Sequence, residues 1–114
     1  MSIRKTEKYS VIYDKSVSQY LYQLTEILLE KDYFSYLDNA LDYIAAIFEF
    51  IEQKIHILQH HAAPKYFSKY QSGMQYIAYP ANKRTTWYIF FKQSDNRFLI
   101  YYITNNHYES PFIR

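Results

Sequence analysis

Apolar residues recur between residues 17 and 28 at the spacing of an amphipathic helix. The intervals are four, three and four residues, in the series Val17, Leu21, Leu24 and Leu28. Such intervals place every member of the series on one face of a helix. Ser16 and Gln19 match a capping box, in which the serine and glutamine side chains bond to the first free amides. We therefore expect a helix that begins at Ser16 and ends near Lys31.

A longer apolar stripe follows and predicts a second helix. Its steps alternate between four and three residues, in the series Leu37, Leu41, Ile44, Phe48, Ile51, Ile55 and Leu58. Ser35 and Asp38 suit the start of this helix, because an early carboxylate favours the helix dipole. The short link between the two helices predicts an antiparallel hairpin. A coiled coil is the competing interpretation, since the stripe spans about three heptads.

Short β-branched and aromatic runs, bounded by turn residues, predict the strands. There are four such runs, at residues 9–13, 75–79, 85–91 and 98–103. Residues 93–96 join the last two strands as a hairpin loop, Gly73 marks a turn, and residues 66–70 are expected to form a loop. The fold class is therefore α+β, with an N-terminal strand and a helical hairpin packed on a small antiparallel sheet.

Composition excludes several classes of protein. The chain has 114 residues, of which 49% are hydrophobic, and this suits a single domain with its own core. It contains no cysteine, which excludes a disulfide framework and a thiol nucleophile and fits a reducing compartment. Gly73 is the one glycine, so a glycine-rich phosphate loop is excluded. Nucleotide hydrolysis and nicotinamide chemistry are poor hypotheses, and no cofactor is expected.

The N-terminus and the apolar runs predict where the protein resides. Residues 1–5 are polar and lack the apolar region of a signal peptide. No stretch reaches the ~20 apolar residues that a membrane span needs, and the run at residues 43–51 is interrupted by Glu49. We therefore expect a cytoplasmic protein without a membrane partner.

Charge is divided unevenly between the two halves of the chain. Residues 1–57 contain six basic residues (Lys and Arg) and nine acidic residues (Asp and Glu). Residues 58–114 contain seven basic and two acidic residues. The basic half also contains most of the predicted strands. A basic, aromatic sheet beside acidic helices favours an anionic partner for the sheet. The alternative is ordinary surface charge.

Polar residues flank the last two predicted strands. Lys83 and Arg84 precede the first of these strands, and four polar residues follow the second: Asn105, Asn106, His107 and Tyr108. If the strands are antiparallel neighbours, both groups lie at one rim of the sheet, and Arg97 lies at the opposite end. Such a set can bind phosphate, and a histidine can transfer a proton near neutral pH. The alternative is a polar sheet edge that is only solvated.

Tyrosine is abundant, with fifteen residues. Tyr88, Tyr101 and Tyr102 lie on the predicted sheet, where they could stack on bases of a single-stranded nucleic acid. Packing is the favoured role for most of them, because sheet aromatics usually bury their rings and solvate their hydroxyls.

His56 and His60 are four residues apart on the second predicted helix, a spacing that allows metal chelation, and His61 is adjacent. A metal site needs further ligands, and no carboxylate follows Glu52 nearby. We expect no metal; histidines at a helix end that favour its dipole are the preferred interpretation.

The end of the chain resembles a known family. Residues 87–91, a short turn and residues 98–103, which lead into Asn106 and His107, resemble the closing hairpin of the RelE/ParE toxin superfamily. The order of strand, helical hairpin and antiparallel sheet resembles that family over nearly the whole chain. Tyr88 and Tyr108 stand where the nuclease branch of the family carries arginines.

The resemblance implies the toxin of a type II toxin–antitoxin pair, with a cognate antitoxin as partner. Such toxins inhibit growth by ribosome-dependent mRNA cleavage or by poisoning DNA gyrase. Cleavage would make the chain a metal-independent endoribonuclease, with His107 as proton carrier, Arg84 and Lys83 as phosphate clamp, and Tyr108 as stacking or acid group. Nucleic acid would be bound by Lys83, Arg84, Tyr88, Asn105 and Asn106.

Two other functions stay open from the sequence alone. One is a non-catalytic binding module whose basic, aromatic sheet face binds protein or single-stranded nucleic acid. The other is a structural role in a protein assembly, with the acidic helices as the interface. A homodimer is compatible with each of these functions.

Overall fold

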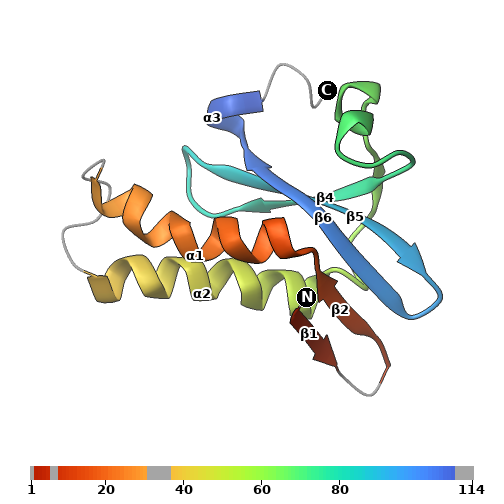
Figure 1. Ribbon diagram of the computed structural model, residues 1–114, viewed down its shortest axis with the longest axis horizontal. Helices are drawn as coiled ribbons and strands as arrows, with labels where there is room; N and C mark the ends of the chain where they lie inside the picture. Colours follow the sequence, from red (N-terminus) through yellow and green to blue (C-terminus); the bar gives the residue numbers. More distant parts are fainter. Residues whose placement is uncertain (1, 6–7, 31–36, 110–114) are drawn as a thin grey trace.

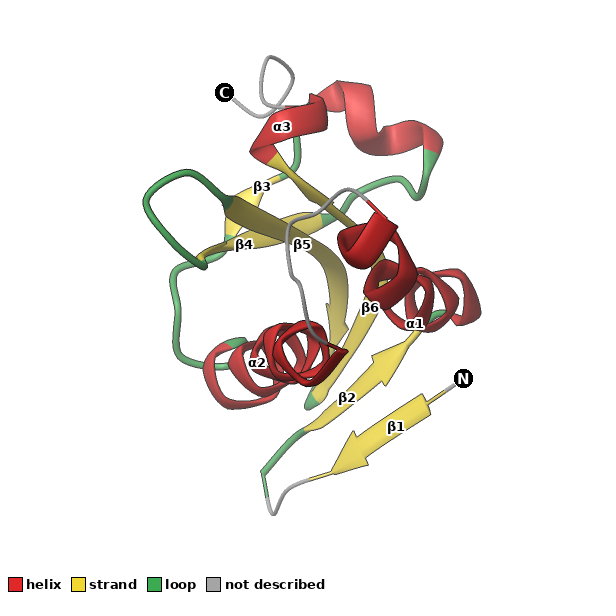
Figure 2. Ribbon diagram, turned by 90° about the vertical axis from the view of Figure 1, so that its left-hand side faces the viewer, coloured by secondary structure: helices red, strands yellow, loops and turns green. Residues whose placement is uncertain are grey.

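The computed structural model describes residues 2–5, 8–30 and 37–109 and is an α+β fold, as expected. Two long helices lie side by side against one face of a sheet (Figure 1), and a view along these helices shows the sheet curving past them (Figure 2). The helices are α1 (Lys15–Glu30), α2 (Leu37–Lys54) and α3 (Asn106–Glu109), with a 3-10 helix η1 (Lys65–Lys69). The strands are β1 (Ser2–Lys5), β2 (Ser10–Tyr13), β3 (His61–Ala62), β4 (Gln75–Pro80), β5 (Thr86–Ser94) and β6 (Arg97–Asn105).

The sheet has the order β1-β2-β6-β5-β4-β3. Every neighbouring pair is antiparallel except β2 and β6, which are parallel, so the sheet is mixed and not wholly antiparallel as expected. Parallel neighbours need a long crossover connection, and here that connection contains the helix pair. The predicted strands and the hairpin between β5 and β6 are confirmed, but its turn is shorter than the expected 93–96, because Gln93 and Ser94 still pair with β6. Asp95 in this turn has φ 55°. β1 and β3 were not expected from the sequence. None of the helices in the described ranges is long and apolar enough to cross a membrane.

A β-bulge interrupts the pairing of the two central strands. Phe90 pairs with Tyr102 and Phe91 with Ile100, so one extra residue, Tyr101, lies between the two partners on β6. An extra residue reverses the alternation of side chains between the faces of a strand. Ile100 and Ile103, an odd number of residues apart, consequently both enter the core beneath the helices.

The start of α1 differs from the expected capping box. The helix begins at Lys15, and the Asp14 carboxylate accepts hydrogen bonds from the Ser16 backbone N (3.0 Å) and from Ser16 Oγ (2.5 Å). The backbone amides of Val17 and Ser18 bond to the Asp14 carbonyl. Asp14 is therefore the N-cap, and the prediction for Ser16 was wrong because the helix begins one residue earlier and the Asp14 carboxylate accepts from the Ser16 amide.

Replacing Asp14 with alanine is expected to lower the free energy of unfolding by about 1 kcal/mol, the usual cost of losing an N-cap. Ser16→Ala is the matched control and should cost clearly less, because its hydroxyl only donates to the Asp14 carboxylate. Urea unfolding of both variants measures the difference. An equal or larger loss of unfolding free energy for Ser16→Ala would instead support Ser16 as the N-cap of a capping box.

The buried face of α2 differs from the predicted stripe. Leu41 is 48% exposed and Leu58 36% exposed, although both belong to that stripe, and Phe48 is only partly buried. Ile44, Ile51 and Ile55 of the predicted stripe are buried as expected, but the buried line also contains Ala40 and Ile47, which the stripe omits. Two neighbouring stripes of one helix both follow steps of three and four, so the pattern alone did not decide which of them meets the core. The expected end of α1 near Lys31 and start of α2 at Ser35 lie outside the described residues.

The two faces of the sheet have separate cores. Side chains from α1 and α2 pack on one face against Val11, Trp87, Ile89, Phe91 and Ile100, among others. On the other face η1 carries Phe67 onto Phe90, with ring centroids 4.4 Å apart and Met74 beside them. Residues 66–70 were expected to form a loop but largely form η1, and the turn at Gly73 is confirmed by its φ of +69°.

Candidate functional site

Antiparallel pairing of β5 and β6 assembles the rim at the end of the sheet. Trp87 pairs with Asn105. Beyond this pair, the Asn106 side chain accepts a hydrogen bond from the Thr86 backbone N (2.8 Å) and donates one to the Arg84 carbonyl (3.0 Å). Arg97 lies at the hairpin end, opposite Ser94. The segments that contain the candidate residues therefore share one edge.

The loop that carries the two rim cations is closed by its own hydrogen bonds. Asn82 Oδ1 accepts from the backbone N of Arg84 and of Thr85, both at 2.9 Å, and the Thr85 carbonyl accepts from Ala81 N and Asn82 N. Lys83 and Arg84 are both exposed. The loop backbone is thus held in place, whereas the two cationic side chains extend into solvent.

His107 and Asn105 bond mainly within the rim. The Asn105 side chain, on a residue only 6% exposed, accepts from the His107 backbone N (2.9 Å) at the start of α3. His107 Nε2 lies 3.0 Å from Thr85 Oγ1. Asn105 and Asn106 therefore hold the rim together rather than present amides to a ligand, while the imidazole and Tyr108 are exposed beside them.

Tyr88 is separated from this rim. It follows Trp87 on β5, and successive side chains of a strand point to opposite faces. Trp87 packs beneath the helices, whereas Tyr88 packs in the cluster around Phe67, with its ring 5.9 Å from Tyr76. The structure therefore does not bring Tyr88 together with His107 as a nucleic-acid contact.

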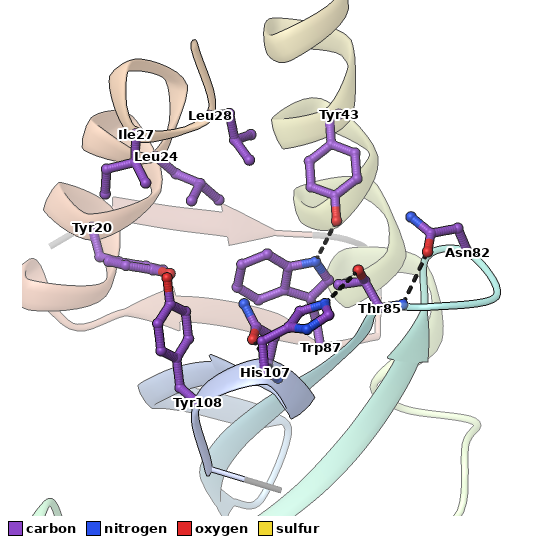
Figure 3. Close-up of a pocket in the computed structure, with 11 residues that line it drawn as sticks. Tyr20, Leu24, Ile27, Leu28, Tyr43, Asn82, Thr85, Trp87, His107 and Tyr108 are labelled. Carbon is purple, nitrogen blue, oxygen red and sulfur yellow. Dashed lines mark hydrogen bonds between the residues drawn. The ribbon is translucent and has the colours of Figure 1, made fainter. Parts of the chain in front are cut away.

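A pocket of about 290 Å³ lies behind the rim (Figure 3). Its walls are aliphatic and aromatic side chains from α1, α2 and β5: Tyr20, Leu24, Ile27, Leu28, Tyr43 and Trp87. Polar residues complete it from the loop, from the end of β6 and from α3: Asn82, Thr85, Asn105, His107 and Tyr108. Sequence reasoning missed this pocket, because its residues come from four segments with no common motif.

Hydroxyl groups of two wall tyrosines stay protonated. Burial raises the pKa of Tyr20 to about 12, with smaller contributions from Tyr108 and Tyr43. Burial likewise raises the pKa of Tyr43, although the bond that Trp87 Nε1 donates to its hydroxyl (2.8 Å) acts in the opposite direction. Both phenols are therefore neutral at physiological pH.

The histidines near the end of α2 have separate partners. His56 stacks on Tyr9, with ring centroids 4.1 Å apart. His60 Nε2 lies 2.6 Å from the Ile55 carbonyl, and its ring packs edge-on against Phe91 at 4.8 Å. Within residues 2–5, 8–30 and 37–109, no three His, Cys, Asp or Glu side chains are grouped as metal ligands.

The rim and the pocket occupy the same end of the sheet, where β5 begins and β6 leads into α3. No protein-family model, curated protein or solved structure matches this chain. The geometry of this end of the sheet and the order of the elements are therefore the features that bear on its function.

Proposed function

We propose that this chain is a RelE/ParE-like toxin of a type II toxin–antitoxin pair, which inhibits growth through the rim of Lys83, Arg84 and His107. The observation that carries the proposal is the order of the elements. β2, the α1–α2 hairpin and the antiparallel strands β4, β5 and β6 occur in this order, with the short β3 and η1 between α2 and β4, and β6 leads directly into Asn106 and His107. This is the order on which the resemblance rests. The expected protein partner is a cognate antitoxin.

Geometry favours binding over RNA cleavage as the toxic mechanism. Cleavage would need cations held in a water-excluded site beside the reacting phosphate, but Lys83 and Arg84 are exposed, where water weakens their field. His107 Nε2 already faces Thr85 Oγ1, and Tyr88 lies on the opposite face of the sheet. Poisoning of DNA gyrase is therefore the preferred mechanism, and ribosome-dependent mRNA cleavage is the alternative.

The face of the sheet beneath η1 favours a second candidate function, a non-catalytic module that binds single-stranded nucleic acid. Tyr70, 38% exposed, stacks on Tyr102 with centroids 3.7 Å apart. Lys69 Nζ lies 3.9 Å from the centre of the Tyr66 ring. Exposed aromatic rings beside a cation are the elements that single-strand binders use.

Controlled induction in cells without an antitoxin tests the rim. The natural chain is expected to arrest growth, and a Lys83→Ala, Arg84→Ala, His107→Ala variant should need roughly tenfold more protein for the same arrest, because ~1.4 kcal/mol of binding is a tenfold change in affinity. The matched control is Lys92→Ala with Arg97→Ala, which removes two cations from the hairpin end and should stay toxic. Colony counts at equal soluble abundance measure the effect.

Different outcomes separate the two candidates. Normal growth of cells that express the natural chain would contradict the proposal that it is a toxin. Salt-dependent binding of single-stranded RNA by that chain would then favour the binding module. Arrest by the triple variant at unchanged abundance would remove the rim as the source of toxicity. Inhibition of purified gyrase without cleavage of ribosome-bound mRNA would support the preferred mechanism.

A further inference from the structure

The pocket behind the rim has the features of a small-molecule site. Such sites combine apolar and aromatic walls with a few placed polar groups. Here Trp87, 2% exposed, is held by the hydrogen bond from its Nε1 to Tyr43 on α2, and α1 contributes Leu24 and Ile27 to the walls. The indole is therefore held against two helices at the back of the pocket (Figure 3).

Size limits the ligand to one or two rings. The volume of about 290 Å³ is roughly twice that of the ~150 Å³ apolar cavity in which benzene is known to bind. It lies at the lower end of the range for ligand pockets, ~300 Å³. A nucleic-acid strand or a protein segment would therefore place at most one aromatic group inside, whereas a two-ring molecule fits as a whole.

Charge at the mouth favours an anion. Asn82 and Thr85 line the pocket, and the two residues between them in the chain are Lys83 and Arg84. His107 and Tyr108 line the mouth from α3. None of the described lining residues is an aspartate or a glutamate, and both wall phenols are neutral. An anionic group at the mouth would thus meet the imidazole of His107 and hydroxyl groups, while Lys83 and Arg84, exposed on the adjoining loop, add positive potential nearby.

We propose that this pocket binds a small planar aromatic molecule with one anionic group, such as an aromatic carboxylate. The ring system lies between Trp87 and the side chains of α1, and the anion lies at the mouth beside His107 and next to the loop that carries Lys83 and Arg84. This ligand site shares Lys83, Arg84 and His107 with the rim proposed for toxicity, but its test uses a small molecule and needs no macromolecular target.

Trp87 gives a direct test, because it is the one tryptophan of the chain. Its indole N–H therefore gives a single signal in a nitrogen–proton correlation spectrum. Titration of the natural chain with naphthoate is expected to shift this signal saturably. Naphthamide, which has the same rings without the charge, should bind about threefold to tenfold more weakly, the effect of one or two solvent-exposed ion pairs.

Three variants locate the site. Lys83→Ala with Arg84→Ala should weaken naphthoate binding about threefold to tenfold, whereas Lys92→Ala with Arg97→Ala, at the opposite end of the hairpin, should leave it unchanged. Ile27→Phe adds volume inside the pocket and should weaken binding at least tenfold without removing a polar group. An unchanged unfolding midpoint for each variant would show that the fold is retained.

Three results would overturn the proposal. The first is an indole signal that does not move, or that moves without saturation, with naphthoate. The second is equal binding by Ile27→Phe and the natural chain, which would place naphthoate outside the pocket. The third is equal affinity for naphthoate and naphthamide, which would show that the pocket does not recognise the anionic group. None of these results depends on whether the chain arrests growth.

Discussion

Replacing Ile47 with alanine is expected to lower the free energy of unfolding by about 3 kcal/mol. Ile47 is 0% exposed and belongs to the core between the helices and the sheet. Removing its branched side chain deletes buried apolar contacts and leaves a cavity that the surrounding helices and strands cannot fully close. Equilibrium unfolding in urea, with an unchanged m-value, measures the loss.

Leu41 on the same helix is the matched control. The step pattern of the sequence places Leu41, and not Ile47, on the core stripe, but Leu41 is 48% exposed. Leu41→Ala should therefore cost less than about 1 kcal/mol, as substitutions at exposed positions usually do. The reverse order of the two costs would mean that α2 turns its other face to the core.

Replacing Phe67 with alanine is expected to destabilise the protein by about 3 to 5 kcal/mol, the usual range for a buried aromatic residue. Phe67 is 0% exposed and stacks on Phe90, with centroids 4.4 Å apart. η1 contributes no other fully buried side chain to the sheet, so this substitution should also detach η1. Thermal unfolding measures the stability, and near-ultraviolet circular dichroism reports the aromatic packing.

Tyr70 provides the comparison for Phe67. Its ring stacks on Tyr102, with centroids 3.7 Å apart, but 38% of the residue is exposed. Tyr70→Ala should cost about 1 kcal/mol, because an aromatic pair adds ~0.5–1.5 kcal/mol beyond the area that it buries. Similar losses for the two variants would indicate that η1 is held by its outer rings rather than by Phe67.

The larger elements of the fold were predictable because local patterns determine them. The apolar series of α1 from Val17 to Leu28 is buried as expected, and the β5–β6 hairpin lies where β-branched and aromatic runs meet turn residues. The helical hairpin followed from the short link between two amphipathic segments. Each of these features depends on residues that are near neighbours in the sequence.

The features that were missed depend on contacts between distant residues. The bulge at Tyr101 is defined by the pairing of Phe90 with Tyr102 and of Phe91 with Ile100. The sequence around Tyr101 contains no turn or glycine signal that predicts it. β1 forms by pairing with β2, so its backbone partners, rather than its own composition, make it a strand. The face of α2 that is buried depends likewise on where the sheet lies.

The candidate site likewise has a part that the sequence predicts and a part that it does not. Antiparallel pairing of β5 and β6 was enough to predict that Lys83, Arg84 and the segment around His107 share an edge. The opposite placement of Tyr88 follows from strand alternation, once Trp87 is known to face the helices. The pocket could not be predicted, because α1, α2, the Asn82 loop and α3 meet there only in the folded chain.

The place of β6 in the sheet has a consequence for synthesis of the protein. β6 pairs with both β2 and β5, yet it follows both of them in the chain. Until residues 97–105 have left the ribosome, the early strands lack their shared neighbour and the helices lack much of the surface that covers their apolar faces. Such distant pairings form slowly, and exposed apolar surface in incomplete chains attracts chaperones or other chains. We therefore expect the nascent protein to be most prone to aggregation before β6 has been made.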